Sequence, residues 1–328
     1  MPIAVTGSIA TDHLMSFPGV FADSLVVDKL DKLSLSFLVE DLEVRRGGCA
    51  ANIAFGLACL GLRPVLVGAV GEDFVDYRSW LERHDIDCDS VHVSDTRHTA
   101  RFVCTTDTTM AQIASFYAGA MSEAREIELA PIERRVGGLD LVVISANDPD
   151  AMLRHTQECR RRGYPFVADP SQQLAFAQGD LIRQLVDGAT YLFTNEYEAS
   201  LTEQKTGWSA DEVLERVGTR VVTLGKEGVR ILRKGEETIE VKALDDVTAI
   251  EPTGVGDAFR SGFLAAVGVG LGLERAAQVG CTIAASVVET TGTQEYVLGK
   301  ARFLERLGGS YGEQAAADVA PHFSFFAP

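Results

Sequence analysis

Short apolar runs, each followed by a polar or glycine-rich turn, recur along this chain of 328 residues. Helical patterns over about 73–84 and 149–161 follow two of these runs. Such runs are typical of a parallel sheet covered by helices on both faces, in which ligands bind beyond the carboxyl ends of the strands. We therefore predict an α/β fold with buried strands at residues 3–6, 65–68, 141–144, 166–168, 191–193 and 221–224.

Two other segments have a different pattern. Residues 33–46 partly alternate between apolar and polar types, and residues 99–116 place apolar side chains among threonines and serines. Alternation of this kind is typical of a sheet with one open face. We predict a small inserted sheet that forms a lid. The predicted lid spans about 11–46 and 97–119, and the predicted large α/β domain spans about 1–10, 47–96 and 120–328.

Composition narrows the choice of partners and compartment. The chain is 46% hydrophobic and 23% charged, as is usual for a globular protein, and its formal net charge of −17 would repel nucleic acid and anionic membranes. No signal-peptide pattern opens the chain, and the apolar run 262–273 is too short and glycine-rich to cross a bilayer. The six cysteines are scattered, which favours reduced core residues, and the six histidines lack metal-ligand spacing. We therefore expect a cytoplasmic protein.

The segment Gly254-Val255-Gly256-Asp257 carries the clearest chemistry. Glycine lets the backbone approach a ligand closely, and a helix N-terminus attracts anions. A carboxylate at an anion site is explained if it takes a proton from a hydroxyl that attacks a phosphate. We predict phosphoryl transfer to an alcohol, with Asp257 as general base and the amides of 254–257, which include Gly254 and Gly256, as anion hole. The structural alternative is that Asp257 only caps a helix after a glycine turn.

A second glycine pair lies in Arg46-Gly47-Gly48-Cys49-Ala50-Ala51-Asn52. With the segment 252–263 and Asn195-Glu196-Tyr197-Glu198, it resembles the ribokinase-type (PfkB) carbohydrate kinase superfamily over nearly the whole chain. The resemblance implies a ribokinase-like fold. Within the superfamily, the segments 7–14, 111–117, 169–173 and 291–295 resemble bacterial adenosine kinases of the actinobacterial type. The implied reaction is ATP plus adenosine giving ADP plus AMP, a step of purine salvage.

The resemblance also implies a nucleoside site. Ribose would be held by Asp12, Gly48 and Asn52, since an ionised carboxylate can span a vicinal diol. Phe102 and Phe116 would stack on the base. Polar contacts to the base or sugar would come from Gln172, Gln173, Ser8 and Ser36. The alternatives are that Asp12 is a turn residue, that Asn52 is a helix-end amide, and that the two phenylalanines are lid core or subunit interface.

For ATP, the resemblance implies roles for Asn195 and Glu198 in organising Mg²⁺, largely through water, which suits the hydration of that ion. The same pair fits a helix capping box, and both interpretations can hold together. The nucleotide phosphates would contact Thr223, Gly225, Gly228, Val255 and Gly256. The family usually has Asp where this chain has Glu251, which leaves a requirement for K⁺ open.

The sequence also bears on other functions and on the assembly. A kinase of the same superfamily that acts on ribose, a ketose or another nucleoside fits most of these residues. A non-catalytic nucleoside-binding protein would not need Asp257. A nicotinamide-dependent oxidoreductase needs Gly-x-Gly-x-x-Gly after its first strand, which Gly7 does not begin. We also expect a homodimer through the lid sheet, whose apolar residues need cover: Leu35, Phe37 and Val39.

Overall fold

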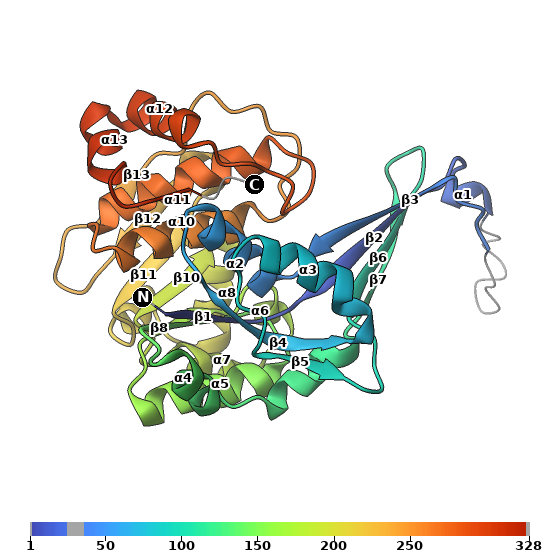
Figure 1. Cartoon of the computed structure of the whole chain (residues 1–328), viewed down its shortest axis with the longest axis horizontal. Coiled ribbons are helices and arrows are strands. Elements are labelled where there is room, and N and C mark those ends of the chain that lie inside the picture. Colours follow the sequence, from blue (N-terminus) through green and yellow to red (C-terminus); the bar gives the residue numbers. More distant parts are fainter. Residues whose placement is uncertain (1, 25–35, 326–328) are drawn as a thin grey trace.

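Every apolar run that was predicted to be a buried strand belongs to one large sheet (Figure 1). The computed structural model describes residues 2–24 and 36–325. Within them this sheet has nine strands in the order β13-β12-β11-β10-β9-β8-β1-β4-β5. The strands from β5 to β11 in this order are parallel, β12 is antiparallel to β11, and β13 is antiparallel to β12. The bounds are β1 (Ile3–Thr6), β4 (Val65–Gly71), β5 (Val91–Ser94), β8 (Leu141–Ser145), β9 (Phe166–Asp169), β10 (Tyr191–Asn195), β11 (Thr219–Thr223), β12 (Val229–Leu232) and β13 (Ile239–Val241).

Helices cover both faces of this sheet, so the predicted α/β class is confirmed. Successive strand residues point to opposite faces, and Ile3 and Val5 of β1 pack in one core while Ala4 packs in the other. The first core lies under α2 (Cys49–Cys59), α3 (Val75–Arg83), α10 (Val255–Gly268), α11 (Leu273–Val288), α12 (Lys300–Tyr311) and α13 (Glu313–Val319). The second lies under α4 (Leu129–Val136), α5 (Pro149–Arg162), α6 (Gln173–Phe176), α7 (Gly179–Val186), α8 (Glu196–Thr206) and α9 (Ala210–Leu214).

The α5 helix shows how local sequence fixes an element. Its N-cap, Asp148, accepts a hydrogen bond from the Ala151 amide, and Pro149 occupies the first helical position, where no amide partner is needed. Arginines fill the last turn, and Gly163 ends the helix with a left-handed φ of 72°. The predicted helix at 149–161 therefore differs from α5 by a single residue at its end. The helix predicted at 73–84 is α3, preceded by the short turn η2 (Glu72–Phe74).

The lid is a separate sheet of four strands among the described residues, in the order β3-β2-β6-β7. Its strands are β2 (Ala10–Ser16), β3 (Asp41–Gly47), β6 (Ala100–Thr106) and β7 (Gln112–Tyr117). The sheet projects from the large domain and carries the short helix α1 (Phe21–Ser24) at its far end (Figure 1). A small sheet distinct from the larger one was predicted and is confirmed.

The expected strand pattern over 33–46 was too long. β3 begins only at Asp41, residues 36–40 form no strand, and residues 33–35 lie outside the described part. Phe37 does not lie on an open face, because its ring packs against those of Phe17 and Phe21 with centroids 4.8 and 4.9 Å apart. Leu35, named with it above, is also outside the described residues.

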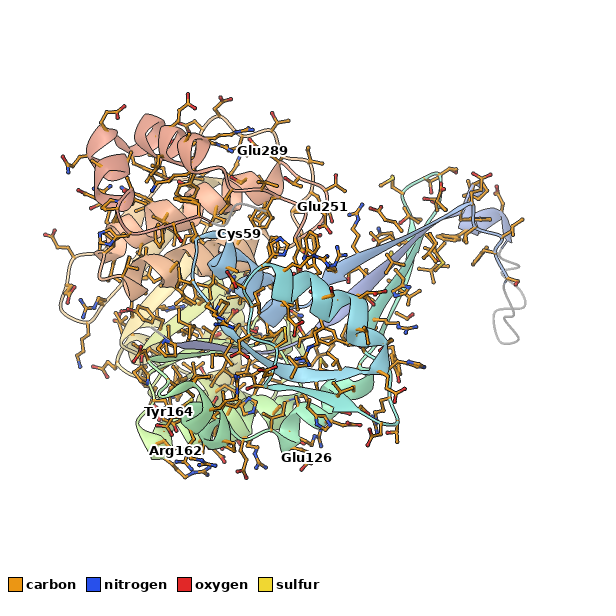
Figure 2. All side chains as sticks on the ribbon, in the orientation of Figure 1. Cys59, Glu126, Arg162, Tyr164, Glu251 and Glu289 are labelled. Carbon is orange, nitrogen blue, oxygen red and sulfur yellow. The ribbon has the colours of Figure 1, made fainter. Side chains whose placement is uncertain are left out.

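All six cysteines are free thiols, and five of them are buried, including Cys59 at the end of α2 (Figure 2). Among the described helices, none combines the length and the apolar character needed to span a membrane. The turns η3 (Gly119–Glu126) and η4 (Gly225–Glu227) complete the elements.

Candidate active site

A cavity of about 1340 Å³ lies where the carboxyl ends of the parallel strands meet the lid. Single small-molecule sites usually occupy about 300–1,000 Å³, so this cavity has room for two ligands. The structure brings almost the whole predicted set together here. The predicted residues that line the cavity are Ser8, Asp12, Gly48, Asn52, Phe102, Phe116, Gln172, Gln173, Asn195, Glu198, Thr223, Gly225, Gly228, Gly254, Val255, Gly256 and Asp257.

Ser36 is the predicted residue that does not line this cavity. In the lid, Gly47 of β3 pairs with Ala10 near the cavity, whereas Asp41 pairs with Ser16 at the far end of the strands. Ser36 precedes Asp41, so it lies beyond the far end of the lid, where it is exposed. In this structure the lid geometry therefore keeps Ser36 away from the site.

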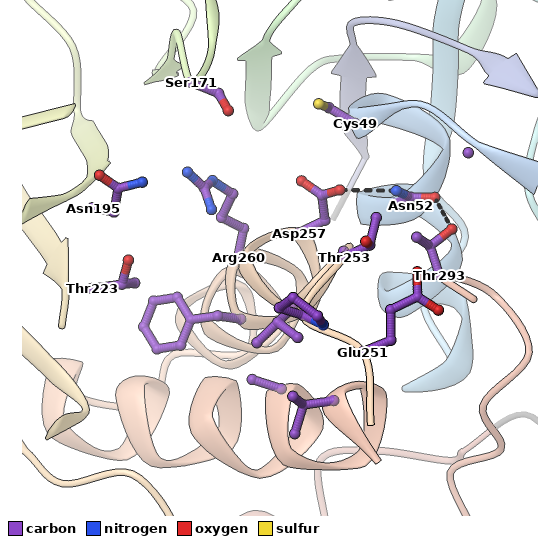
Figure 3. Close-up of a pocket in the computed structure, with 18 of the residues that line it drawn as sticks. Cys49, Asn52, Ser171, Asn195, Thr223, Glu251, Thr253, Asp257, Arg260 and Thr293 are labelled. Carbon is purple, nitrogen blue, oxygen red and sulfur yellow. Dashed lines mark hydrogen bonds between the residues drawn. The ribbon is translucent and has the colours of Figure 1, made fainter. Parts of the chain in front are cut away.

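Asp257 lies in the first turn of α10, midway along the cavity (Figure 3). It is not the helix cap, because Gly254 occupies that position, so the capping alternative is wrong. Asn52 of α2 donates a hydrogen bond of 2.9 Å from Nδ2 to Asp257 Oδ2. The Asn52 Oδ1 atom accepts hydrogen bonds from Thr293 Oγ1 (2.9 Å) and Gln294 Nε2 (3.0 Å), which fixes the orientation of the amide.

The surroundings of Asp257 suit a general base. Its removal from water raises the pKa of the carboxyl, while Arg260 and the Asn52 hydrogen bond oppose that rise. A carboxylate with a raised pKa is a better proton acceptor. The neighbouring amides of the first helical turn have no partners within the helix, and their residues line the same cavity. An alcohol and an anion could therefore meet at this point.

Each of the two glycines before Asp257 is needed for a different physical reason. Gly254 has a φ of 76°, and a Cβ there would lie 2.8 Å from Thr293 Cγ2. At Gly256, which has ordinary helical geometry, a Cβ would lie 2.8 Å from Nη1 of Arg260. The first glycine therefore makes the turn possible, and the second leaves room for a guanidinium.

One end of the cavity lies against the lid. Asp12 is a strand residue of β2 and not a turn residue, and it pairs across the sheet with Arg45 of β3 and Phe102 of β6. Burial raises the pKa of Asp12 to about 6, Glu251 adds to the rise, and Arg45 opposes it. Phe102 in turn pairs with Phe116 of β7, so an acid and two aromatic rings share one face of the lid.

Arg45 also ties the lid to the loop that precedes α10. Its Nη1 donates to Glu251 Oε2 at 2.8 Å, and the Gly292 amide donates to the same oxygen at 3.0 Å. Glu251 lies at the junction of the lid and the large domain (Figure 2). The longer side chain at this position therefore bridges two parts of the molecule.

The other end of the cavity lies beyond β10 and β11. Asn195 and Glu198 form a capping box at the start of α8, with reciprocal hydrogen bonds of 2.8 Å. Both side chains also line the cavity, so the structural and the functional interpretations are compatible. Thr223 is the last residue of β11, and the turn η4 follows this strand. The opposite wall is mostly apolar and includes Ala243, Leu244, Val247, Ala284, Ala285 and Val288.

Metal binding at this end would depend on few protein ligands. Within the described residues, no group of three or more His, Cys, Asp or Glu side chains could hold a metal ion. Asn195 and Glu198 offer oxygen atoms, which Mg²⁺ prefers, and that ion commonly keeps several waters and binds substrate phosphates. The donor set therefore fits a hydrated magnesium ion that arrives with a phosphate ligand.

Comparison with known proteins gives the family. The model of the pfkB family of carbohydrate kinases matches residues 21–298. The chain belongs to the pfkB family of carbohydrate kinases. The resemblance that the two glycine motifs suggested is therefore confirmed at the level of the family, and with it an ATP-dependent kinase.

Individual relatives of this pfkB kinase include nucleoside kinases. The chain is 29% identical to the nucleoside kinase of Methanocaldococcus jannaschii over 310 residues, which cover 93% of the chain and 96% of that protein. The Burkholderia thailandensis nucleoside kinase in complex with inosine has a TM-score of 0.82 and 31% identity over 94% of this chain and 98% of that one, and its complex with ADP-inosine a TM-score of 0.78. Saccharomyces cerevisiae adenosine kinase is 29% identical over 171 residues, 48% of this chain and 49% of that protein.

Several cavity residues of this pfkB kinase were not predicted. Arg260 stands three residues after Asp257 and thus on the same helical face, a signal that could have been used. Arg45 and Thr293 reach their partners only through the fold, as does Asp169, which contacts Arg260 without lining the cavity. Phe176 lines the mouth of the cavity and is 79% exposed, and nothing in the sequence pattern marks it.

Proposed function

We propose that this kinase transfers the γ-phosphoryl group of MgATP to the 5′-hydroxyl of a purine nucleoside, with adenosine as the preferred acceptor. The observation that carries the proposal is the position of Asp257. It lies between a lid-side compartment with an acid and aromatic rings and a second compartment with backbone turns and an apolar wall. A base placed between two compartments is suited to join two substrates.

The purine preference is supported by the relatives and by the lid. The Burkholderia enzyme is described in complex with inosine and with ADP-inosine, and the yeast relative is an adenosine kinase. Phe102 and Phe116 give the lid face a flat apolar surface, on which a base gains from offset stacking. Ribose has no such group, so the aromatic lid favours a nucleoside over a free sugar. Formation of AMP would return adenosine to the nucleotide pool.

The proposed chemistry uses groups that the structure brings together. Asp257 takes the proton of the 5′-hydroxyl, and the oxygen bonds to the γ-phosphorus as the bond from that phosphorus to the bridging oxygen breaks. ADP leaves with the electron pair. The amides of 254–257 donate to the oxygens on which charge develops, an effect that is worth roughly 3–4 kcal/mol for one donor. The lid would exclude water and so limit hydrolysis of ATP.

Magnesium would enter with ATP. Asn195 and Glu198 would face the hydrated ion, which neutralises part of the charge on the β- and γ-phosphates when bound. The carboxylate of Glu251 already accepts hydrogen bonds from Arg45 and Gly292, so we expect activity without added K⁺. Assays in sodium and potassium salts of equal ionic strength would test this expectation.

An acceptor panel tests the function. With MgATP, we expect adenosine to be phosphorylated more efficiently than inosine, cytidine or ribose, as measured by kcat/KM in an assay of ADP release. Equal efficiency with ribose would refute the nucleoside assignment. Removal of magnesium by a chelator should abolish the reaction.

Substitution of the base tests the mechanism. Asp257→Asn should lower kcat by about 1,000-fold or more, because the amide cannot accept the proton, while calorimetry still detects adenosine binding. Asp87→Asn is the control, since Asp87 pairs with Arg135 outside the cavity and its loss should leave kcat unchanged. Near-normal turnover of Asp257→Asn would contradict the base assignment.

A further inference from the structure

Arg260 is a buried cation at the anion hole. Its side chain is 6% exposed, and it extends from α10 toward Asp257 and Asn195 at the centre of the cavity (Figure 3). The close approach of Nη1 to Gly256, where a Cβ would lie 2.8 Å away, places the guanidinium beside the middle of the segment 254–257. The amides that would receive the migrating phosphoryl group thus have a fixed positive charge beside them.

Not every N–H donor of the Arg260 guanidinium has a hydrogen-bond partner. Nη2 lies 2.6 Å from Asp169 Oδ1, and Asp169 is itself only 1% exposed. However, Nε of Arg260 has no hydrogen-bond partner among the described residues. An arginine has five N–H donors, so a buried one with spare donors can bind a further anion.

The other basic residues of the cavity lie elsewhere. Arg45 is bonded to Glu43 and Glu251, and Arg46 lies over the ring of Trp80. Lys226 is exposed in the turn η4. Among the described residues that line the cavity, Arg260 is therefore the cationic side chain beside Asp257.

We propose that Arg260 is a catalytic residue whose guanidinium contacts the γ-phosphoryl group and stabilises the charge that develops on it, together with the amides of 254–257. The inference rests on the proposed function. The proton still goes to Asp257, ADP still leaves with the electron pair, and Arg260 stays protonated throughout. A planar cation with several donors matches the oxygens of a phosphoryl group in transfer.

A structural role would give a different result. If Arg260 only neutralised Asp169, its loss would have no further effect once that carboxylate had been removed. We therefore compare Arg260→Gln in the wild-type background with Arg260→Gln in an Asp169→Asn background. A catalytic role predicts a loss of kcat of about 100- to 1,000-fold in both backgrounds, with the KM for adenosine within a few-fold of its starting value.

Arg220 provides a matched control. It is equally buried, its Nη2 lies 2.6 Å from Glu203 Oε1, and its Nε also has no partner among the described residues, but it does not line the cavity. Arg220→Gln should lower the melting temperature, as Arg260→Gln does, and leave kcat unchanged. Added guanidinium ion at millimolar concentration should restore part of the activity of Arg260→Ala and none of that of Asp257→Asn.

Different results would refute the proposed function and the proposed role of Arg260. A wild-type protein that phosphorylates no nucleoside would refute the proposed function. An active wild-type protein whose Arg260→Gln variant keeps its kcat, or loses it only when Asp169 is present, would refute the role of Arg260 alone.

Discussion

Asn52 illustrates how one side chain serves a different partner from the one first expected. It was predicted to hold ribose. In the structure its Nδ2 donates to Asp257, and its Oδ1 accepts from Thr293 and Gln294. One N–H of its amide is left for a substrate, so Asn52 can position the base and still bind sugar.

For Asp12 we expect opposite effects on folding and on binding: its buried charge lowers the stability of the fold, while its carboxylate helps to bind adenosine. Burial raises the pKa of its carboxyl to about 6, so the charged form destabilises the folded state above that pH. Stability therefore falls as pH rises through the interval from about 4 to about 6. Asp12→Asn should melt several degrees higher than wild type at pH 7.5, with the difference shrinking as pH falls, and should bind adenosine about 10- to 100-fold more weakly.

For a second aspartate, Asp73, we expect the charged carboxylate to stabilise the fold. Although burial opposes it, hydrogen bonds from Thr99 and Arg101 lower the pKa of Asp73 to about 2. Its charged form stabilises the fold, and that contribution is lost as pH falls toward 2. Asp73→Asn should therefore melt lower than wild type at pH 7.5. A lower melting temperature for both variants at that pH would contradict the role assigned to the buried charge of Asp12.

Two helices begin at the cavity through glycines. α2 starts after Gly48, with a φ of 96°, and α10 starts after Gly254. At Gly48 a Cβ would lie 2.5 Å from the Ser8 carbonyl oxygen and 2.7 Å from the Ala10 amide nitrogen. Both neighbours are backbone atoms, one in the link after β1 and one at the start of β2, and they cannot move aside cheaply. The start of α2, the helix that carries Asn52, is therefore packed tightly against the backbone that leads into β2 of the lid.

We expect Gly48→Ala to destabilise the protein by at least about 1–2 kcal/mol, the usual penalty for a left-handed residue with a Cβ, and to lower activity because Asn52 shifts. Urea unfolding gives the free energy. Gly309→Ala is the control, because Gly309 lies within α12 with nothing near its Cβ position and should gain about 0.5–1 kcal/mol. Equal stability of the two variants would argue against tight packing at Gly48.

The lid has an outer face that the structure leaves uncovered. Its inner face carries Asp12, Phe102 and Phe116 beside the cavity, and the alternation of strands places other apolar side chains outside. Exposed apolar residues on β3 and β7 of the lid include Leu42, Val44, Ile113 and Tyr117. Exposed apolar side chains gathered on one face often mark an interface. These side chains, and not the three predicted from the sequence, support a homodimer through the lid.

A charged substitution on the outer face of the lid tests whether the protein forms a dimer there. Wild type should sediment as a dimer at micromolar concentration, and Val44→Lys should sediment as a monomer, because a buried lysine in the interface would lack a partner. Val75→Lys is the control, since Val75 is also exposed but lies on α3 of the large domain. A wild-type monomer, or a dimer that survives Val44→Lys, would remove the lid interface.

Features of this protein that depend on neighbouring residues could be predicted from the sequence, and features that depend on distant residues could not. The run 141–144 became β8 and the helix at 149–161 became α5, since both have local signals. The boundary of β3 was missed because residues 36–40 continue the alternating pattern without pairing with β2. Most of the predicted residues line the cavity because they belong to short contiguous motifs, whereas the place of Ser36 depended on the direction in which the lid extends.

By itself, the amino-acid sequence determined the class of fold, the two glycine turns and the presence of an acid at a helix start, because each depends on neighbouring residues. Only the tertiary structure decided which groups surround that acid. Asn52 and Asp257 are 205 residues apart, and Arg45 and Glu251 are 206 apart. Arg260 meets Asp169 only because α10 packs beside the end of β9. Such contacts follow from the order of strands and the position of the lid, which local hydrophobic patterns do not encode.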